Sequence, residues 1–139
     1  MRKSDLAYMA GLFDGEGCIL ITRKSYNHHQ YYLRCTLSMA NEYLPELLKF
    51  NFGGGIRKRD LRTKGWQIQW EWKVFGNQAK DFLQVILPYI KLKHSEAELG
   101  IKFQKSMCSR KGVGRALTAD ELATREAQRL LMSELKMKQ

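Results

Sequence analysis

Hydrophobic residues recur with two different periods along this chain, and the change of period predicts its secondary structure. Apolar side chains at positions i, i+3, i+4 and i+7 are typical of helices, whereas strict alternation is typical of half-buried strands. The stretches with helical spacing are residues 4–13, with Ser4 as the N-cap, then 43–52, 77–86, 95–107 and 118–136. The stretches that predict strands are residues 18–22, 31–39, 56–59 and 66–74. The expected order is helix, two strands, helix, two strands, helix, and then C-terminal helices.

Glycines and capping residues mark the expected ends of these elements. Gly15 and Gly17 are expected to break the first helix, because glycine inside a helix costs about 1 kcal/mol relative to alanine. The three glycines at 53–55 predict a C-cap and a turn after the second helix. Two capping boxes with S/T-x-x-E spacing predict the starts of the last two helices, namely Ser95 with Glu98 and Thr118 with Glu121.

Two strand pairs separated by single helices predict one four-stranded antiparallel sheet with helices on one face. This is an α+β fold of order αββαββα with extra C-terminal helices. The chain of 139 residues suffices for one domain with a modest core, so we expect a single domain over residues 1–139. The core fold would span 1–107, and a C-terminal loop and helix would span 108–139. Trp66, Trp70 and Trp72 share one strand face, which we interpret as core rather than as a base-stacking platform.

The charge of the chain points to a polyanionic partner. The formal net charge is +10 and the pI is near 9.7. Residues 56–65 (IRKRDLRTKG) hold five basic residues opposed only by Asp60. Nucleic acid is the expected partner. A membrane is not, because the chain has no amphipathic basic helix and no apolar run near the roughly 20 residues of a membrane span.

The cysteines and the N-terminus bear on the compartment. Cys18, Cys35 and Cys108 are odd in number and lie far apart, which favours free thiols over disulfides or a zinc site. The N-terminus lacks the long apolar segment of a signal peptide. We therefore expect a reducing, intracellular setting, and a bacterial, phage or organellar host fits equally well.

The uncovered face of the predicted sheet carries side chains that suit base edges in the major groove of duplex DNA. Arginine pairs with guanine, glutamine with adenine, and glutamate accepts from cytosine. The residues expected to bind DNA are Thr22, Lys24, Gln30, Tyr32, Arg34, Thr36, Arg57, Arg59, Gln67, Gln69 and Glu71.

The end of the first predicted helix breaks several local rules. Ala7, Gly11 and Gly15 recur every four positions and so line one helix face with very small residues. Asp14 and Glu16 follow where the helix dipole is negative, which disfavours acids by about 0.3–1 kcal/mol each. A segment that violates several rules together is a candidate functional site.

Residues 9–17 (MAGLFDGEG) resemble the signature of the LAGLIDADG homing endonucleases. Five positions match it outright: Ala10, Gly11, Leu12, Asp14 and Gly17. Met9, Phe13, Gly15 and Glu16 stand for leucine, isoleucine, alanine and the second aspartate of the signature. The αββαββα order also matches the fold of this family over most of residues 1–107.

The resemblance implies a homodimer, because the chain contains one signature and each copy supplies half of a catalytic centre. In the family the signature helix packs against its counterpart in the partner subunit. The residues expected at this interface are Ala7, Gly11, Asp14 and Gly15.

The resemblance also implies the site residues. The last acid of the signature binds a divalent metal, so Glu16 and the carbonyl of Gly15 would hold Mg²⁺, a site that Mn²⁺ or Ca²⁺ can also occupy. Lys93 matches the active-site lysine that precedes a late helix. Met39 stands where the family often has glutamine or asparagine, and Asn41 is the expected catalytic substitute, with Ser38 a weaker one.

These resemblances imply a Mg²⁺-dependent, sequence-specific double-strand DNA endonuclease. It would cut a long, near-palindromic site and leave 3′ overhangs. The alternative is a non-cleaving binder on the same scaffold, either a maturase that binds intron RNA or a DNA-binding regulator. A His-Asn-His nuclease is a weaker interpretation, because His28 and His29 lack a third histidine or suitably spaced cysteines.

Overall fold

A computed structural model describes residues 1–25, 30–108 and 117–138 of the chain. Its helices are α1 (Lys3–Glu16), α2 (Tyr43–Phe52), α3 (Gly76–Ile86), α4 (His94–Cys108) and α5 (Ala119–Met137), with short 3-10 turns η1 (Arg62–Lys64) and η2 (Leu87–Tyr89). Its strands are β1 (Gly17–Arg23), β2 (Tyr31–Met39), β3 (Gly55–Arg59) and β4 (Gln69–Phe75). His28 and His29 lie outside the described residues.

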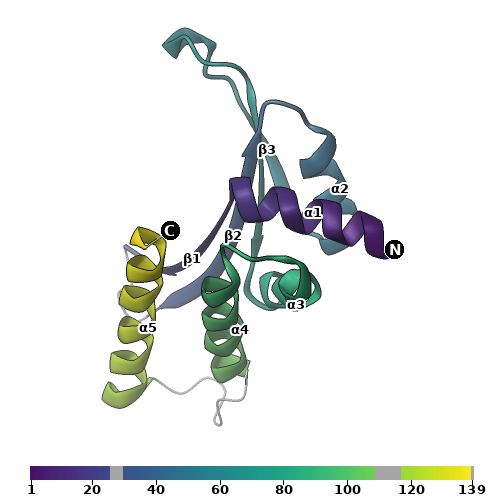
Figure 1. Ribbon diagram of the computed structural model, residues 1–139. Coiled ribbons are helices and arrows are strands. Elements are labelled where there is room, and N and C mark those ends of the chain that lie inside the picture. The colour runs from purple at the N-terminus through teal and green to yellow at the C-terminus, as the bar shows by residue number, and fades with distance from the viewer. Residues whose placement is uncertain (26–29, 109–116, 139) are drawn as a thin grey trace.

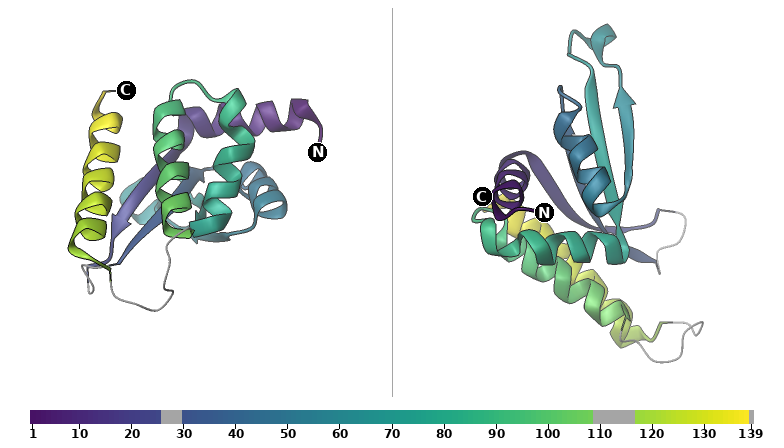
Figure 2. Two further views of the ribbon diagram at one scale, coloured as in Figure 1. Left: turned by 90° about the horizontal axis from the view of Figure 1, so that it is seen from below. Right: turned by 90° about the vertical axis from the view of Figure 1, so that its right-hand side faces the viewer.

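The four strands form one antiparallel sheet in the order β1-β2-β4-β3 (Figure 1). Helices α3, α4 and α5 lie side by side over one face, as Figure 2 shows from below. The predicted α+β fold is therefore confirmed, including its strand pairing and the helical layer. No helix among the described residues is long and apolar enough to cross a membrane.

The core lies between the sheet and the helices and is centred on aromatic rings. Phe82 of α3 makes edge contacts with three rings, at centroid distances of 4.9 Å to Phe13, 4.9 Å to Phe52 and 5.0 Å to Trp72. Phe13, Trp72 and Phe82 are fully buried. Burial of such a side chain contributes roughly 1.5–3 kcal/mol, so these rings join α1, α2 and α3 to the sheet.

Helix α1 differs from its prediction at both ends. It begins at Lys3 with Arg2 as the N-cap, and no side chain caps it, so the assignment of Ser4 was wrong. It also continues through Gly15 to Glu16 rather than ending near Phe13. Gly17 follows at once as the first residue of β1, where a Cβ atom would lie 2.3 Å from the Phe13 ring. Gly17 therefore permits the close approach of the Phe13 ring to the backbone, and Gly15 does not interrupt the helix.

The two predicted capping boxes had different outcomes. The box at α5 is confirmed, because the Thr118 hydroxyl and the Glu121 carboxylate each accept the other residue's backbone N–H at 3.1 Å. The box at Ser95 was wrong, since α4 begins at His94. Glu98 instead lies 3.1 Å from the His94 ring nitrogen Nδ1. The carboxylate of the distant Asp14 binds the N–H groups of the three residues directly before α4.

The predicted strand 66–74 starts too early. β4 begins at Gln69, and Gln67 and Trp66 lie before it in the β3–β4 turn. Trp66 is 65% exposed, whereas Trp72 is fully buried, so the tryptophan face is core at one end only. The β3–β4 hairpin extends past the helices that cover the sheet (Figure 1). Trp70 is partly buried, and the Lys58 ammonium lies 5.5 Å from the centroid of its ring.

Candidate active site and nucleic-acid interface

Helix α1 ends against the segment that leads into α4, and Asp14 joins the two. Its carboxylate accepts hydrogen bonds from the backbone N–H groups of Lys91, Leu92 and Lys93, each at 2.9 Å. These donors are the three residues directly before α4. Asp14 thus fixes the start of a helix that begins 80 residues further along the chain.

The pKa of Asp14 reflects this environment. Burial acts to raise the pKa, but the three backbone N–H donors and the nearby Lys93 ammonium outweigh burial and bring it below its usual value of 3.8. Asp14 is only 8% exposed. Its carboxylate is directed into its own chain, and a contact of Asp14 with a partner subunit stays a prediction.

Lys93 is held at the same junction. Its side chain is 8% exposed, and its Nζ donates to the Asp14 carbonyl at 2.7 Å. That carbonyl belongs to the last turn of α1, where the helix dipole attracts a cation. Two predicted residues from distant parts of the sequence thus meet the same helix end: Glu16 is the last residue of α1, and Lys93 binds the carbonyl of Asp14, two residues before it. Glu16 is exposed there, while Lys93 is buried.

Glu96 is a charged residue at this junction that the sequence analysis missed. It lies in the first turn of α4 and is 1% exposed. Burial raises its pKa, the nearby Lys136 and Lys93 lower it, and Asp14 raises it further, with a net upward shift. Lys136 of α5 also donates to Cys18 Sγ at 3.1 Å. No local signal could have found Glu96, because two of the charges near it, Asp14 and Lys136, come from the distant helices α1 and α5.

The donors at the end of α1 fit half of a metal site. Glu16 offers an exposed carboxylate, and Gly15 is among the last residues of α1, whose carbonyls lack helical partners. Carboxylate and carbonyl oxygens suit hard cations such as Mg²⁺. In the described part of the chain no group of three or more His, Cys, Asp or Glu side chains could hold a metal ion. Glu16 and the Gly15 carbonyl are thus two oxygen donors of a candidate cation site.

Asn41 is not brought to this junction by any described contact. It lies beyond the end of β2, and its Oδ1 accepts the backbone N–H of Tyr43 at 2.8 Å, at the start of α2. The other residues that line the surface hollow beside Asn41 all belong to α2 or directly precede it. Met39 packs against the core, as its position in the alternation predicted. Ser38 lies opposite Glu71 in the β2–β4 register.

The small residues of α1 form an outward face. Ala7, Gly11 and Gly15 are exposed, whereas Met9 and Phe13 on the other side are fully buried. A Cβ atom built at Gly11 or Gly15 meets nothing within 4 Å. The small-residue stripe is therefore open to a partner and has no role in packing within the chain.

The strand register places most of the predicted DNA-binding residues on one face. In β1 and β2, Thr22 lies opposite Tyr32, while Arg34 and Thr36 share the parity of Tyr32. The facing residues of β4 and β3 continue these rows: Thr36 with Lys73, Ser38 with Glu71 and Arg57, and Gln69 with Arg59. Lys24 and Gln30 extend the β1–β2 pairing through a 2.9 Å backbone bond. Gln67 is outside the sheet.

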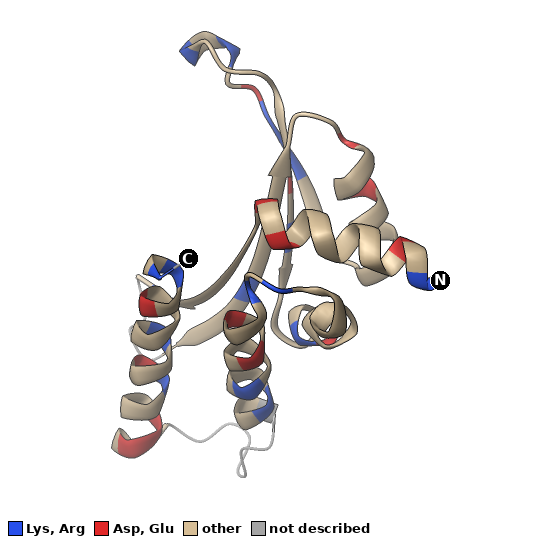
Figure 3. Cartoon of the chain, in the orientation of Figure 1, with Lys and Arg blue, Asp and Glu red and all other residues tan. Residues whose placement is uncertain are grey.

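Glu71 has a different environment from the one predicted. Its carboxylate is paired with three cations, at 3.1 Å to Lys73, 3.4 Å to Arg57 and 3.6 Å to Arg59. Glu71 is therefore already engaged within the sheet, where it holds these cations side by side, and its contact with cytosine stays a prediction. Lys73 was not among the predicted DNA-binding residues, although its parity in β4 would have identified it. Figure 3 shows basic residues along the β3–β4 hairpin.

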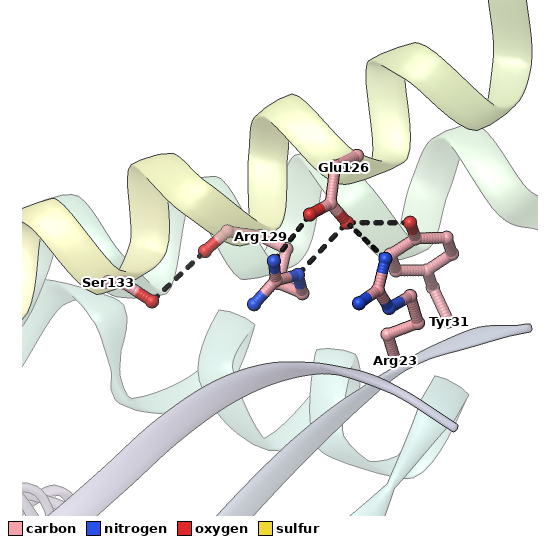
Figure 4. Close-up of polar contacts among 5 residues, drawn as sticks. All are labelled: Arg23, Tyr31, Glu126, Arg129 and Ser133. Atoms are coloured by element: carbon pink, nitrogen blue, oxygen red, sulfur yellow. Dashed lines mark hydrogen bonds and ion pairs between the residues drawn. The ribbon is translucent and has the colours of Figure 1, made fainter. Parts of the chain in front are cut away.

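A polar cluster fastens α5 to the β1–β2 hairpin (Figure 4). Glu126 accepts from the Tyr31 hydroxyl at 2.6 Å and from Arg129, and it lies 3.9 Å from Arg23. Hydrogen bonds from Arg129 and Tyr31 lower the pKa of Glu126 to about 2. In the same view the Ser133 hydroxyl donates to the Arg129 carbonyl. The C-terminal helix thus supports the strands next to residues 26–29.

Known proteins share both the sequence pattern and the fold of this chain. Residues 9–106 match the sequence model of the LAGLIDADG endonuclease family. No curated protein sequence matches. The homing endonuclease I-CvuI, solved with a DNA target, is 20% identical and similar over 96% of each chain, with a TM-score of 0.66.

Two further solved structures share the fold. The archaeal intron-encoded homing endonuclease I-Vdi141I, complexed with DNA, is 13% identical over 95% of this chain and 84% of its own, with a TM-score of 0.74. The meganuclease I-SmaMI, bound to DNA, is 19% identical over 96% of this chain and has a TM-score of 0.68. This chain covers 46% of I-SmaMI.

Proposed function

The chain belongs to the LAGLIDADG endonuclease family, and we propose that it cuts both strands of duplex DNA as a Mg²⁺-dependent homodimer. The observation that carries this proposal is the end of α1, where Glu16 is exposed and the buried Lys93 donates to the Asp14 carbonyl. Hydrogen bonds that the Asp14 carboxylate accepts from backbone N–H groups hold Lys93 in place, as preorganised catalysis requires.

The open stripe on α1 supports the dimer. Ala7, Gly11 and Gly15 leave room for a second backbone to approach closely, and Tyr8, which is exposed beside them, adds apolar surface. Two-fold pairing of α1 would bring the two Glu16 carboxylates near each other. Glu16 and the Gly15 carbonyl from each subunit would then contribute to a shared site.

Glu16 and the Gly15 carbonyl would hold a divalent cation, Mg²⁺ in the first place, with Mn²⁺ or Ca²⁺ as substitutes. The chemistry that such a cation supplies is charge neutralisation on the phosphate and activation of a water. Lys93 would place its ammonium beside the scissile phosphate and stabilise charge that develops in the transition state. Asp14 fixes Lys93 at two points, because its carboxylate accepts the Lys93 backbone N–H and its carbonyl accepts from Lys93 Nζ.

The open sheet face would read the target in the major groove, because a β-ribbon fits that groove. Each subunit would then read one half of a long, near-palindromic site, since two-fold protein symmetry imposes two-fold readout. We propose that cutting takes place across the minor groove and leaves 3′ overhangs. The described contacts of Asn41 give it no catalytic task, so its proposed role depends on a rearrangement when DNA binds.

The test is cleavage of a randomised duplex-DNA library by the wild type and by Glu16→Gln, with Mg²⁺ and with EDTA. We expect Mg²⁺-dependent cuts from the wild type and none from Glu16→Gln, while both proteins bind the selected sequence. Glu98→Gln is the matched control, since Glu98 is an exposed acid of α4 paired only with His94 among described contacts. Cutting by Glu16→Gln at the wild-type rate would overturn the proposal.

The dimer has its own test. Gly11→Leu should keep the chain folded, because the side chain points into open space, and should shift sedimentation from dimer to monomer. A variant that stays fully dimeric would exclude the α1 pairing.

A non-cleaving binder is the second candidate, favoured by the core-packed Met39 in place of a polar side chain. It predicts tight binding to duplex DNA or to structured intron RNA without metal-dependent cutting. Competition between the two nucleic acids separates a regulator from a maturase.

A further inference from the structure

The open face of the sheet contains an apolar island among its charges. Phe75, the last residue of β4, is 47% exposed and lies opposite Arg34 in the β2–β4 register. The Tyr32 ring lies beside it, with ring centroids 5.8 Å apart and planes inclined at 53°. Arg34 also lies opposite Leu20 on its other side. Phe75, Tyr32 and Leu20 therefore lie around Arg34, on a face that otherwise holds cations and hydrogen-bonding groups.

A hollow opens directly over this island. It has a volume of about 630 Å³ and is lined by Thr22, Arg23, Lys24, Ser25, Tyr32 and Phe75. A smaller hollow of about 240 Å³ lies on the other side of Phe75, toward Arg57 and Lys73. The exposed ring thus separates two recesses, and both recesses have basic groups on their rims. The basic rims suit phosphates, whereas the apolar ring between them suits neither a phosphate nor a hydrogen-bonding base edge.

In duplex DNA the faces of the bases are covered by their neighbours, so only base edges can reach a sheet in the major groove. Among those edges the 5-methyl group of thymine is the apolar one. We propose, on the premise of the proposed DNA binding, that Phe75 and Tyr32 form a contact for a thymine methyl group and so specify thymine at one position of each half-site. The hydrogen-bonding residues around them cannot detect that methyl group, because it has neither donor nor acceptor.

The test begins with the duplex sequence that the wild-type homodimer selects from a randomised library. Each thymine is then replaced in turn by deoxyuridine, which removes only the methyl group and keeps the base pair. At one position in each half-site we expect the Kd to rise roughly fourfold per half-site, the factor that burial of one methylene-sized group supports. The same duplex with deoxyuridine elsewhere should bind as tightly as the parent.

Variants identify the residues responsible. Phe75→Ala should bind the thymine and deoxyuridine duplexes equally, whereas Phe75→Leu and Tyr32→Phe should still distinguish them because they keep apolar surface there. Phe50→Ala is the matched control, since Phe50 is an exposed phenylalanine on α2, away from the sheet face. The deoxyuridine series on the wild type needs no variant, so it stands even if Phe75→Ala folds poorly.

The outcomes separate this inference from the proposed function. If the wild type selects and cuts a duplex but no deoxyuridine replacement weakens binding, the thymine contact is overturned and the endonuclease stands. A thymine preference that Phe75→Ala retains also overturns it. If the protein selects no duplex at all, both the contact and the proposed function fail.

Discussion

The end of α1 and the open face of the sheet hold charged groups in opposite ways. At the end of α1, Asp14, Lys93 and Glu96 are buried, and the bonds of Asp14 and Lys93 to backbone groups measure 2.7–2.9 Å. On the sheet, the ion pairs of Glu71 with its cations measure 3.1–3.6 Å, and Arg57 is largely exposed. The first arrangement fixes geometry, whereas the second can be exchanged for a new partner.

The difference teaches how one small domain can combine precision with adaptable recognition. Buried polar groups bonded to backbone cannot move without leaving a donor or acceptor unsatisfied, which costs about 1–3 kcal/mol each. Exposed ion pairs contribute about 0–1 kcal/mol, so phosphates or bases can replace them at little cost. Substitutions should therefore affect folding at the end of α1 and DNA binding on the sheet.

The largest expected effect is that of Asp14→Asn. The asparagine amide would direct N–H groups toward the backbone N–H donors of residues 91–93, so part of the hydrogen bonding that fixes the start of α4 would be lost. We expect a loss of about 3–5 kcal/mol in the free energy of unfolding, measured in urea. Asp5→Asn is the control, since Asp5 is paired only with the exposed Arg2 among described contacts. A loss below about 1 kcal/mol would show that the junction does not depend on this carboxylate.

Gly17→Ala should follow in size. The added methyl group would lie 2.3 Å from the Phe13 ring, and such overpacking costs about 1–3 kcal/mol. Gly55→Ala is the matched control, because its methyl group meets nothing within 4 Å and its φ is not positive. The Tm should therefore fall for Gly17→Ala and stay near that of the wild type for Gly55→Ala. A neutral Gly17→Ala would contradict the close approach of Phe13.

Glu126→Gln tests a contact intermediate between the two regions. The folded-state pKa of Glu126 is about 2, below its ordinary value of 4.5, so its contribution is present above pH 4.5 and is lost as the pH falls toward 2. We expect the variant to lose about 1–2 kcal/mol at pH 7 and to match the wild type near pH 2. Urea unfolding from pH 7 to 2 measures this, with the exposed Glu134→Gln as the control. A difference that does not depend on pH would exclude the ionised carboxylate as the cause.

Arg57→Ala should have the smallest effect on folding and a clear one on binding. The free energy of unfolding should change by about 0.5 kcal/mol or less, since Arg57 is exposed and Glu71 keeps Lys73 and Arg59 as partners. If Arg57 contacts a phosphate, binding should weaken on all sequences, and the slope of log K against log salt should fall by about 1. Arg2→Ala, at the far end of α1, should leave the slope unchanged. A loss confined to one target position would assign Arg57 to a base instead.

Local spacing determined much of this molecule. Alternation in residues 31–39 and the apolar spacing of residues 77–86 encode which side chains face the core, so the strands, the helices and their order could be predicted. The Thr118–Glu121 cap could be predicted because both partners lie within one turn. The small-residue stripe on α1 followed from its four-residue spacing, and Lys93 was singled out by the resemblance to a family in which a lysine precedes a late helix.

Only the tertiary structure decided which distant groups meet. Asp14 reaches donors 77–79 residues away, Glu71 collects cations from two strands, and Trp66 is exposed because the β3–β4 hairpin extends beyond the helices. The Ser95 cap failed because α4 already begins at His94, directly after the three residues whose N–H groups bind the distant Asp14 carboxylate. Periodicity specifies the face on which a side chain lies, but the fold of the whole chain specifies what lies opposite that face.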